Sequence, residues 1–132
     1  MNNTFRKNER ITSRLLIDHL FGSGESKSVT AFPLKAVYCI VPHHETDATV
    51  QTLISVPKRH FKRAVKRNRV KRQIREGYRL HKNILPDVGE GKQLLIAFIW
   101  LSDSLSTTAE VEQRIIKLLK KIHTNLNTPL DA

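Results

Sequence analysis

The sequence predicts an α+β fold, a single-domain sandwich in which helices pack on one side of a small mixed β-sheet. Two observations support this prediction. Apolar residues recur every three or four positions in three segments, which is the spacing of one helix face. Runs rich in β-branched and aromatic residues lie between those segments. The expected order is therefore helix, strand, strand, helix, strand, helix, with room for one further short strand between Leu80 and Gly91.

The first helix is expected to follow Thr12 and Ser13, whose hydroxyl oxygens can cap it, and to end at 22–24, where two glycines occur. Its apolar residues should dock on the sheet. Two segments with strand composition follow, Leu34 to Val41 and Val50 to Val56, separated by a polar turn region. Together these two strands suggest a β-hairpin.

The second half of the chain begins with Pro57, which ends a strand and precedes a basic helix. The most apolar stretch, 93–101, is too short to span a bilayer and predicts a strand buried on much of both faces. Residues 107–110 read Thr-Thr-Ala-Glu, which offers a capping box for a last amphipathic helix. The apolar face of that helix is expected to contain Val111, Ile115, Leu118, Leu119, Ile122 and Leu126.

Composition indicates one domain over residues 1–132, with flexible ends at 1–8 and 127–132. The chain has 132 residues, 39% of them hydrophobic, and a formal net charge of +11. Its one cysteine, Cys39, is expected to be a small buried residue. No apolar run is long enough for a transmembrane helix, and the N-terminus lacks an apolar signal segment. We therefore expect a cytoplasmic protein without a membrane partner.

Positive charge is concentrated between Lys58 and Lys82, where twelve of the 23 Lys and Arg residues stand against one acid, Glu76. A disordered basic tail would not need a periodic apolar face. Here Val70, Ile74, Tyr78 and His81 recur at helical spacing. The segment is therefore predicted to be a helix with a core side and a charged side.

The charged side of this helix is predicted to bind nucleic acid. Arg67, Lys71, Arg75 and Arg79 form one row with steps of four, and Asn68 and Arg72 lie beside it. Acids that could relieve the like-charge repulsion are missing, so a polyanion is the favoured partner over a solvated surface. The candidate RNA-binding residues are Lys58, Arg59, Lys62, Arg63, Lys66, Arg67, Asn68, Arg69, Lys71, Arg72, Arg75 and Arg79.

Groups for protein-based catalysis are not apparent in the sequence. The segment 43–47, with two histidines, a glutamate and an aspartate, is the only ligand-like cluster, and a solvated turn is favoured over a metal site there. The other acids are scattered in predicted turns, and His60, amid cations, is interpreted as a phosphate contact. We therefore predict no metal or cofactor bound by the protein alone and no RNA cleavage by it.

The basic helix resembles the signature helix of the bacterial ribonuclease P protein subunit. The resemblance rests on residues 64–76, which contain Ala-Val, Arg-Asn-Arg, Lys-Arg and Arg-Glu in the family's order and spacing. Upstream, the segment 54–59 resembles the strand end that leads into that helix. The connection at 60–63 departs from the family because it is one residue longer and follows Pro57, where Ser is more usual.

The resemblance implies an accessory subunit of an endoribonuclease that matures the 5′ end of tRNA. In that family the RNA subunit carries the active site and its Mg²⁺, and the small protein helps to remove the 5′ leader from precursor tRNA. The implied partners are thus ribonuclease P RNA and precursor tRNA, with no obligate protein partner. A left-handed βαβ crossover around the signature helix is implied as well.

The resemblance also implies roles for individual residues. Four residues would meet the catalytic RNA: Arg67, Asn68, Arg69 and Arg72. Lys71 and Arg75 would border a cleft for the single-stranded leader, on a floor formed by Ile17, Phe21 and Tyr38. Aromatic floor residues suit this task because unpaired bases stack on them without sequence preference. Ile17 is aliphatic, so it can contact bases but stacks poorly.

Two other classes of function remain open at this stage. A general structured-RNA-binding or ribosome-associated protein would share this charge and fold but would not assist precursor cleavage. A membrane-surface or acidic-protein adaptor could also use a basic helix, although large apolar residues for insertion do not flank the cations.

Overall fold

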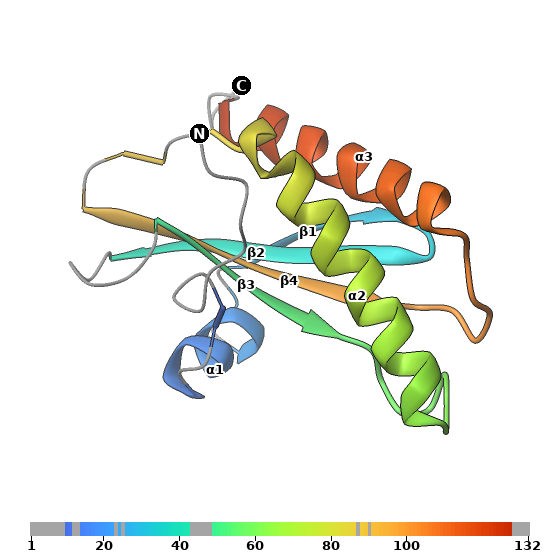
Figure 1. The fold of residues 1–132 in the computed structure, drawn as a ribbon. Coiled ribbons are helices and arrows are strands. Elements are labelled where there is room, and N and C mark those ends of the chain that lie inside the picture. Colours follow the sequence, from blue (N-terminus) through green and yellow to red (C-terminus); the bar gives the residue numbers. More distant parts are fainter. Residues whose placement is uncertain are drawn as a thin grey trace.

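The computed structural model describes residues 10–11, 14–22, 24, 26–42, 49–86, 88–89 and 91–127. These residues form an α+β fold, which confirms the predicted class (Figure 1). In chain order the elements are α1 (Arg14–Gly22), β1 (Lys27–Ala31), β2 (Leu34–Pro42), β3 (Val50–Ser55), α2 (Ala64–His81), the 3₁₀ turn η2 (Lys82–Ile84), β4 (Lys92–Trp100) and α3 (Thr108–Asn127).

The four strands lie in the order β1-β2-β4-β3. β2 pairs antiparallel with both β1 and β4, whereas β3 pairs parallel with β4. Because parallel neighbours need a crossover connection, the chain between β3 and β4 must return along the sheet, and α2 provides this return. The resulting βαβ unit agrees with the resemblance, and its left-handedness stays a prediction.

The predicted hairpin between 34–41 and 50–56 is wrong. β4 lies between β2 and β3, and the hairpin partner of β2 is β1. β1 was not predicted because its residues are mostly polar and exposed, as suits an edge strand. The room left for a further short strand between Leu80 and Gly91 is not filled by one among the described residues there, where α2 runs into η2.

Helices cover both faces of the sheet, so the expectation of helices on one side is wrong. α2 and α3 pack on one face and α1 on the other (Figure 1). Because side chains alternate along a strand, β4 directs Leu94, Ile96 and Phe98 to the α2–α3 face, and Leu95 and Ala97 to the α1 face. All five are fully buried, which confirms the predicted burial of this strand on both faces.

The apolar side of α2 packs between the sheet and α3. Val70, Ile74 and Tyr78 are buried, as predicted, and the Tyr78 ring lies 5.7 Å from the Phe98 ring on β4. His81 is half-buried at the edge of this face, and its Nε2 lies 2.7 Å from a carboxylate oxygen of Glu112 on α3. The predicted division of this helix into a core side and a charged side is confirmed.

α2 and α3 approach each other closely at Gly77. A Cβ built at this position would lie 3.2 Å from Ile115 Cγ1, tighter than ordinary van der Waals contact. Glycine therefore permits this packing distance despite its cost in helix propensity.

The predicted capping box of α3 is confirmed. The Glu110 backbone N–H donates to Thr107 Oγ1 (3.1 Å), and the Thr107 backbone N–H donates to the Glu110 carboxylate (3.1 Å). The bonds that the Thr107 backbone N–H and then its hydroxyl (3.0 Å) donate to the Glu110 carboxylate lower the pKa of Glu110. The predicted apolar face is also confirmed, since Leu126 packs against the core and five residues are buried: Val111, Ile115, Leu118, Leu119 and Ile122.

Candidate nucleic-acid interface

The loop between β3 and α2 is anchored by its apolar residues. Val56 and Phe61 are buried, and the His60 backbone N–H donates to the Pro57 carbonyl (3.1 Å). His60 Nδ1 also lies 2.7 Å from a carboxylate oxygen of Asp103, which ties the loop to the segment before α3. Only 11% of the His60 side chain is exposed, so little of its ring is left for the predicted phosphate contact.

The cations of this loop lead directly into the N-terminus of α2. Arg63 is the N-cap residue, yet it makes no side-chain capping hydrogen bond, and the first turn of α2 contains no acid. The first amides of a helix carry partial positive charge when they are uncapped. Backbone dipoles and cationic side chains therefore add together here, an arrangement that favours a phosphate. Four loop cations are exposed: Lys58, Arg59, Lys62 and Arg63.

The predicted RNA-contacting side of α2 falls into two groups that differ in exposure. Four residues are exposed: Lys66, Asn68, Arg69 and Arg72. The other row is half-buried and comprises Arg67, Lys71, Arg75 and Arg79. The two groups lie next to each other around the helix, and the half-buried row borders the packed side.

Arg67 positions the loop that precedes the helix. Its Nη1 donates to the backbone carbonyls of Phe61 (2.7 Å) and Lys62 (2.9 Å). Bonds from a guanidinium to carbonyl oxygens are stronger than neutral ones. Arg67 therefore holds the exposed cations of the loop in place, and its own contact with RNA stays a prediction.

Arg79 is paired with the one acid of the helix. Its Nε donates to a Glu76 carboxylate oxygen at 3.2 Å, and its Nη2 forms a second, shorter bond to the same group. The hydrogen bonds from Arg79 lower the pKa of Glu76, so this carboxylate stays charged at neutral pH. The charge of Arg79 is thus largely offset by Glu76. Arg75 is therefore the last residue of the half-buried row whose positive charge is not paired with an acid of the helix.

A hollow of about 230 Å³ lies where α2 faces the open edge of the sheet. Lys71 and Arg75 contribute its α2 side, as the resemblance implied for a cleft. The other lining residues are Arg10, Ile11, Thr52, Leu53 and Ile54. The backbone N–H of Ile11 donates to the carbonyl of Thr52 on β3 (2.8 Å), which brings the N-terminal segment to this edge.

Arg75 is the residue of the hollow with the strongest sign of an unmet contact. Its Nε is buried and makes no hydrogen bond within the described residues. A buried donor without an acceptor is costly unless a ligand supplies one. Lys71 lies one turn earlier on the same row and is also half-buried.

The predicted aromatic floor is wrong for Tyr38. This residue is 2% exposed on the α2–α3 face, and its hydroxyl accepts a hydrogen bond from Asn125 Nδ2 (3.0 Å). Ile17 packs on the opposite, α1 face, so one surface cannot contain both. Phe21, at the end of α1, is half-exposed, but neither Ile17 nor Phe21 lines the hollow beside Lys71. The apolar residues that line the hollow are aliphatic: Ile11, Leu53 and Ile54.

The residues that the sequence analysis missed are those of the N-terminal segment and β3. Arg10 and Thr52 are 42 positions apart in the chain and form a parallel bridge. No local pattern signals such a pairing. The edge position of β3, which depends on the crossover through α2, brings them together.

Within the described part of the chain, no three His, Cys, Asp or Glu residues form a group that could hold a metal ion. The ligand-like cluster at 43–47 lies outside the described residues. Cys39 is buried, as predicted. None of the described helices is long and apolar enough to cross a membrane.

The chain is similar to known proteins over most of its length. A family model described as Ribonuclease P matches residues 5–123. The ribonuclease P protein component of Porphyromonas gingivalis is 43% identical over 122 residues, covering 91% of this chain and 87% of that protein. The corresponding protein of Chlorobium phaeobacteroides is 30% identical over 129 residues, covering 91% and 88%.

Solved structures share the fold. The RNase P protein from Thermotoga maritima superposes with a TM-score of 0.63 at 23% identity, covering 86% of this chain and 98% of that one. A Staphylococcus aureus RNase P protein mutant with defective mRNA degradation activity gives a TM-score of 0.67 at 23% identity, covering 87% and 88%.

Proposed function

Because the chain belongs to the ribonuclease P protein family, we propose that its two cationic regions hold two different RNAs. The protein component acts in tRNA 5′ processing as the accessory subunit of an endoribonuclease. In our proposal, the exposed cations around the N-terminus of α2 bind ribonuclease P RNA. The hollow beside Lys71 and Arg75 receives the 5′ leader of precursor tRNA.

The observation that carries this assignment is the difference in exposure between the two regions. The exposed Arg69 and Arg72 can reach the phosphates of a large folded RNA, to which arginine offers a planar fork of donors. Lys71 and Arg75 are half-buried on the wall of a narrow hollow, which suits one unpaired strand. The buried Nε of Arg75 would gain a phosphate oxygen as its acceptor.

The hollow should hold the leader without strong preference for its bases. Its apolar lining is aliphatic, so bases can contact it but stack poorly. The cations should therefore supply most of the leader affinity, through phosphates that every leader shares. Phe21, half-exposed at the end of α1, is the remaining aromatic candidate for a leader that extends beyond the hollow.

The proposed mechanism is electrostatic. Leader and catalytic RNA are both polyanions, and bringing them together is costly when Mg²⁺ is scarce. The cations of the protein lower that cost, while the RNA subunit binds Mg²⁺ and performs the chemistry. The protein should therefore act mainly on substrate affinity and Mg²⁺ requirement, in the cytoplasm where precursor tRNA is made.

The first experiment measures cleavage of a 5′-extended precursor tRNA at low Mg²⁺ with ribonuclease P RNA alone, the protein alone, and both together. Activity only in the mixture supports the proposal. Tight RNA binding without a gain in cleavage would instead indicate a general RNA-binding protein, and cleavage by the protein alone would reveal an active site in this chain.

A second experiment tests the hollow. The double variant Lys71→Gln/Arg75→Gln should lose most of the preference of the holoenzyme for precursor over mature tRNA, because only the precursor has a leader. The control Lys35→Gln/Lys92→Gln removes the same charge from two β-strands outside the proposed interface. If both variants keep the preference equally, the leader does not pass through this hollow.

A further inference from the structure

A second basic surface lies on α3 and the β1–β2 hairpin, and the proposed function does not use it. β1 is one edge strand of the sheet and β3 is the other. α3 packs against β1 and α2 against β3, so this surface and the leader hollow belong to opposite edges of the sheet (Figure 1). We call it the α3 surface; it comprises Phe32, Arg114, Lys117, Lys120 and Lys121.

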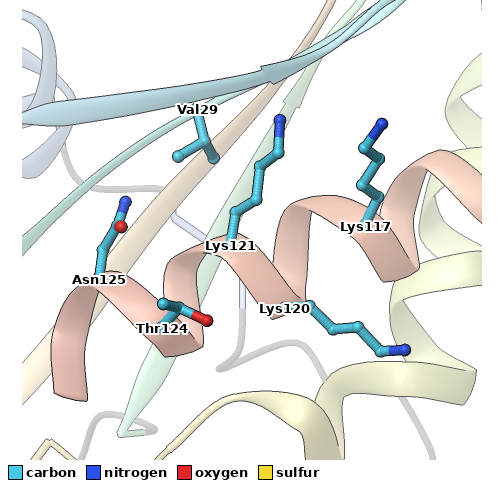
Figure 2. A pocket seen from close by; sticks show the side chains of 6 residues that line it. All are labelled: Val29, Lys117, Lys120, Lys121, Thr124 and Asn125. Carbon is cyan, nitrogen blue, oxygen red and sulfur yellow. The ribbon is translucent and has the colours of Figure 1, made fainter. Parts of the chain in front are cut away.

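A hollow of about 390 Å³ overlaps the α3 surface. Its lining residues are Val29, Lys117, Lys120, Lys121, Thr124 and Asn125. Figure 2 shows Lys117 and Lys121 pointing toward the strand side from successive turns of α3, while Lys120 points the other way. Lys117 and Lys121 are therefore the lysines that face the strands at this hollow.

Two of these cations donate hydrogen bonds to the backbone of the β1–β2 hairpin. Arg114 Nε donates to the carbonyl of Phe32 (2.9 Å), and Lys121 Nζ donates to the carbonyl of Thr30 (2.8 Å). Lys117 and Lys120 are exposed. The α3 surface therefore combines two cations that contact the hairpin backbone with two exposed lysines.

The positive charge of the α3 surface is not offset by acids of its own helix. α3 contains no Asp or Glu from Gln113 to Asn127. Of its two acids, Glu110 is bound to Thr107 and Glu112 contacts His81 on α2. Like charges three and four residues apart destabilise a helix, so this clustering is unfavourable until an anion binds.

An exposed aromatic ring lies at one end of the row of cations. Phe32, in the turn between β1 and β2, is 64% exposed. Its backbone is held by Arg114, the first cation of the row. A large exposed aromatic beside cations is the combination that binds unpaired nucleic acid, because a base stacks on the ring while phosphates meet the charges.

We propose that the α3 surface is a second RNA-binding site, which takes an unpaired RNA segment other than the leader. The phosphates of that segment lie along Arg114, Lys117 and Lys121, and one base stacks on Phe32. Since the two sites belong to opposite edges of the sheet, the protein can hold two RNA segments at once. This inference rests on the proposed RNA-binding function and extends it to a surface outside α2.

The test uses the full chain and a fluorescently labelled 12-nucleotide oligouridine at several salt concentrations. Wild type should bind two oligonucleotides. Lys117→Gln/Lys121→Gln should weaken one site about fivefold or more at low salt, and lower the salt slope by about 1.4, or about 0.7 for each phosphate contact to a single strand. Phe32→Leu should weaken the same site through lost stacking. Lys71→Gln/Arg75→Gln should weaken the other site.

The control Lys35→Gln/Lys92→Gln has the same net charge as the α3 variant, so it measures the effect of charge alone. If wild type binds one oligonucleotide, or if the α3 variant behaves like this control, the proposal is wrong. Thermal unfolding is measured alongside, and an unchanged midpoint assigns any loss of binding to the surface. Failure of the proposed function is a separate result, because it appears as no stimulation of precursor cleavage by wild type.

Discussion

The two long helices begin in opposite ways. α3 starts with a capping box, in which Thr107 and Glu110 satisfy two backbone amides and place a negative charge in the first turn. α2 starts at Arg63 without a side-chain cap, and its first turn has no acid. A capped N-terminus stabilises a helix by about 1 kcal/mol. α2 forgoes this stabilisation, and its N-terminus keeps the positive potential that an RNA phosphate can use.

The contrast indicates that α2 depends on tertiary packing more than α3 does. Its buried residues Val70, Ile74 and Tyr78 attach it to the sheet, and Gly77 lets it lie close to α3. Burial of the apolar side of α2 therefore compensates for the repulsion between the cations on its charged side. The following predictions test this contrast, from the largest expected effect to the smallest.

Gly77→Val should destabilise the protein by about 1–3 kcal/mol, because its branched side chain would collide with Ile115 where the helices meet. The measurement is the free energy of unfolding in urea. Gly22→Val is the matched control, since a Cβ at Gly22 would meet nothing within 4 Å. Equal effects of the two substitutions would show that the close approach of α2 and α3 is unimportant.

Arg67→Ala should reduce the stability of the protein, whereas Arg69→Ala should reduce RNA binding with little effect on stability. Arg67 donates to two backbone carbonyls, so its loss should cost about 1–2 kcal/mol of stability. Arg69 is exposed, so its loss should leave stability within about 0.5 kcal/mol of wild type. Arg69→Ala should still reduce the salt slope for binding to ribonuclease P RNA by about one.

Urea unfolding and RNA binding at several salt concentrations measure these two effects. Destabilisation by Arg69→Ala, together with none by Arg67→Ala, would contradict the division of roles within the basic helix.

Adding a cap to α2 and removing the cap of α3 should change the free energy of unfolding in opposite directions. Arg63→Ser offers α2 a capping hydroxyl and should stabilise the protein by about 0.5–1 kcal/mol, while it weakens RNA binding through the lost cation. Thr107→Ala removes the cap of α3 and should destabilise by about 1 kcal/mol, with RNA binding unchanged. Stronger RNA binding by Arg63→Ser would refute the idea that the uncapped terminus serves the ligand.

The smallest effect concerns pH. Because the pKa of Glu110 is lowered by its bonds to Thr107, the stabilisation from this carboxylate is present above its unfolded pKa and is lost as pH falls through the lower folded value. Unfolding free energies of wild type and Glu110→Gln should therefore converge slightly as the pH falls below about 4. The variant Lys117→Gln, with no carboxylate removed, should keep the wild-type pH profile.

Much of the α2 interface could be predicted from local pattern. Helical spacing separated Val70, Ile74 and Tyr78 from the cations, and the capping box located the start of α3, because both signals depend on residues within one or two turns. The roles of individual cations could not be predicted from the local pattern. Arg67 and Arg79 occur in the same row as Lys71, yet their partners, the loop carbonyls and Glu76, distinguish them only in the folded chain.

The sequence by itself determined the α+β class, the two-sided basic helix, the buried central strand and the family, because each follows from short-range periodicity or residue order. Only the tertiary structure decided that β4 separates β2 from β3, that α1 lies on the opposite face from α2, and that Tyr38 is buried. Strand order depends on contacts between distant residues. A shift of one position along a strand exchanges its faces, so composition cannot show which residue meets the ligand.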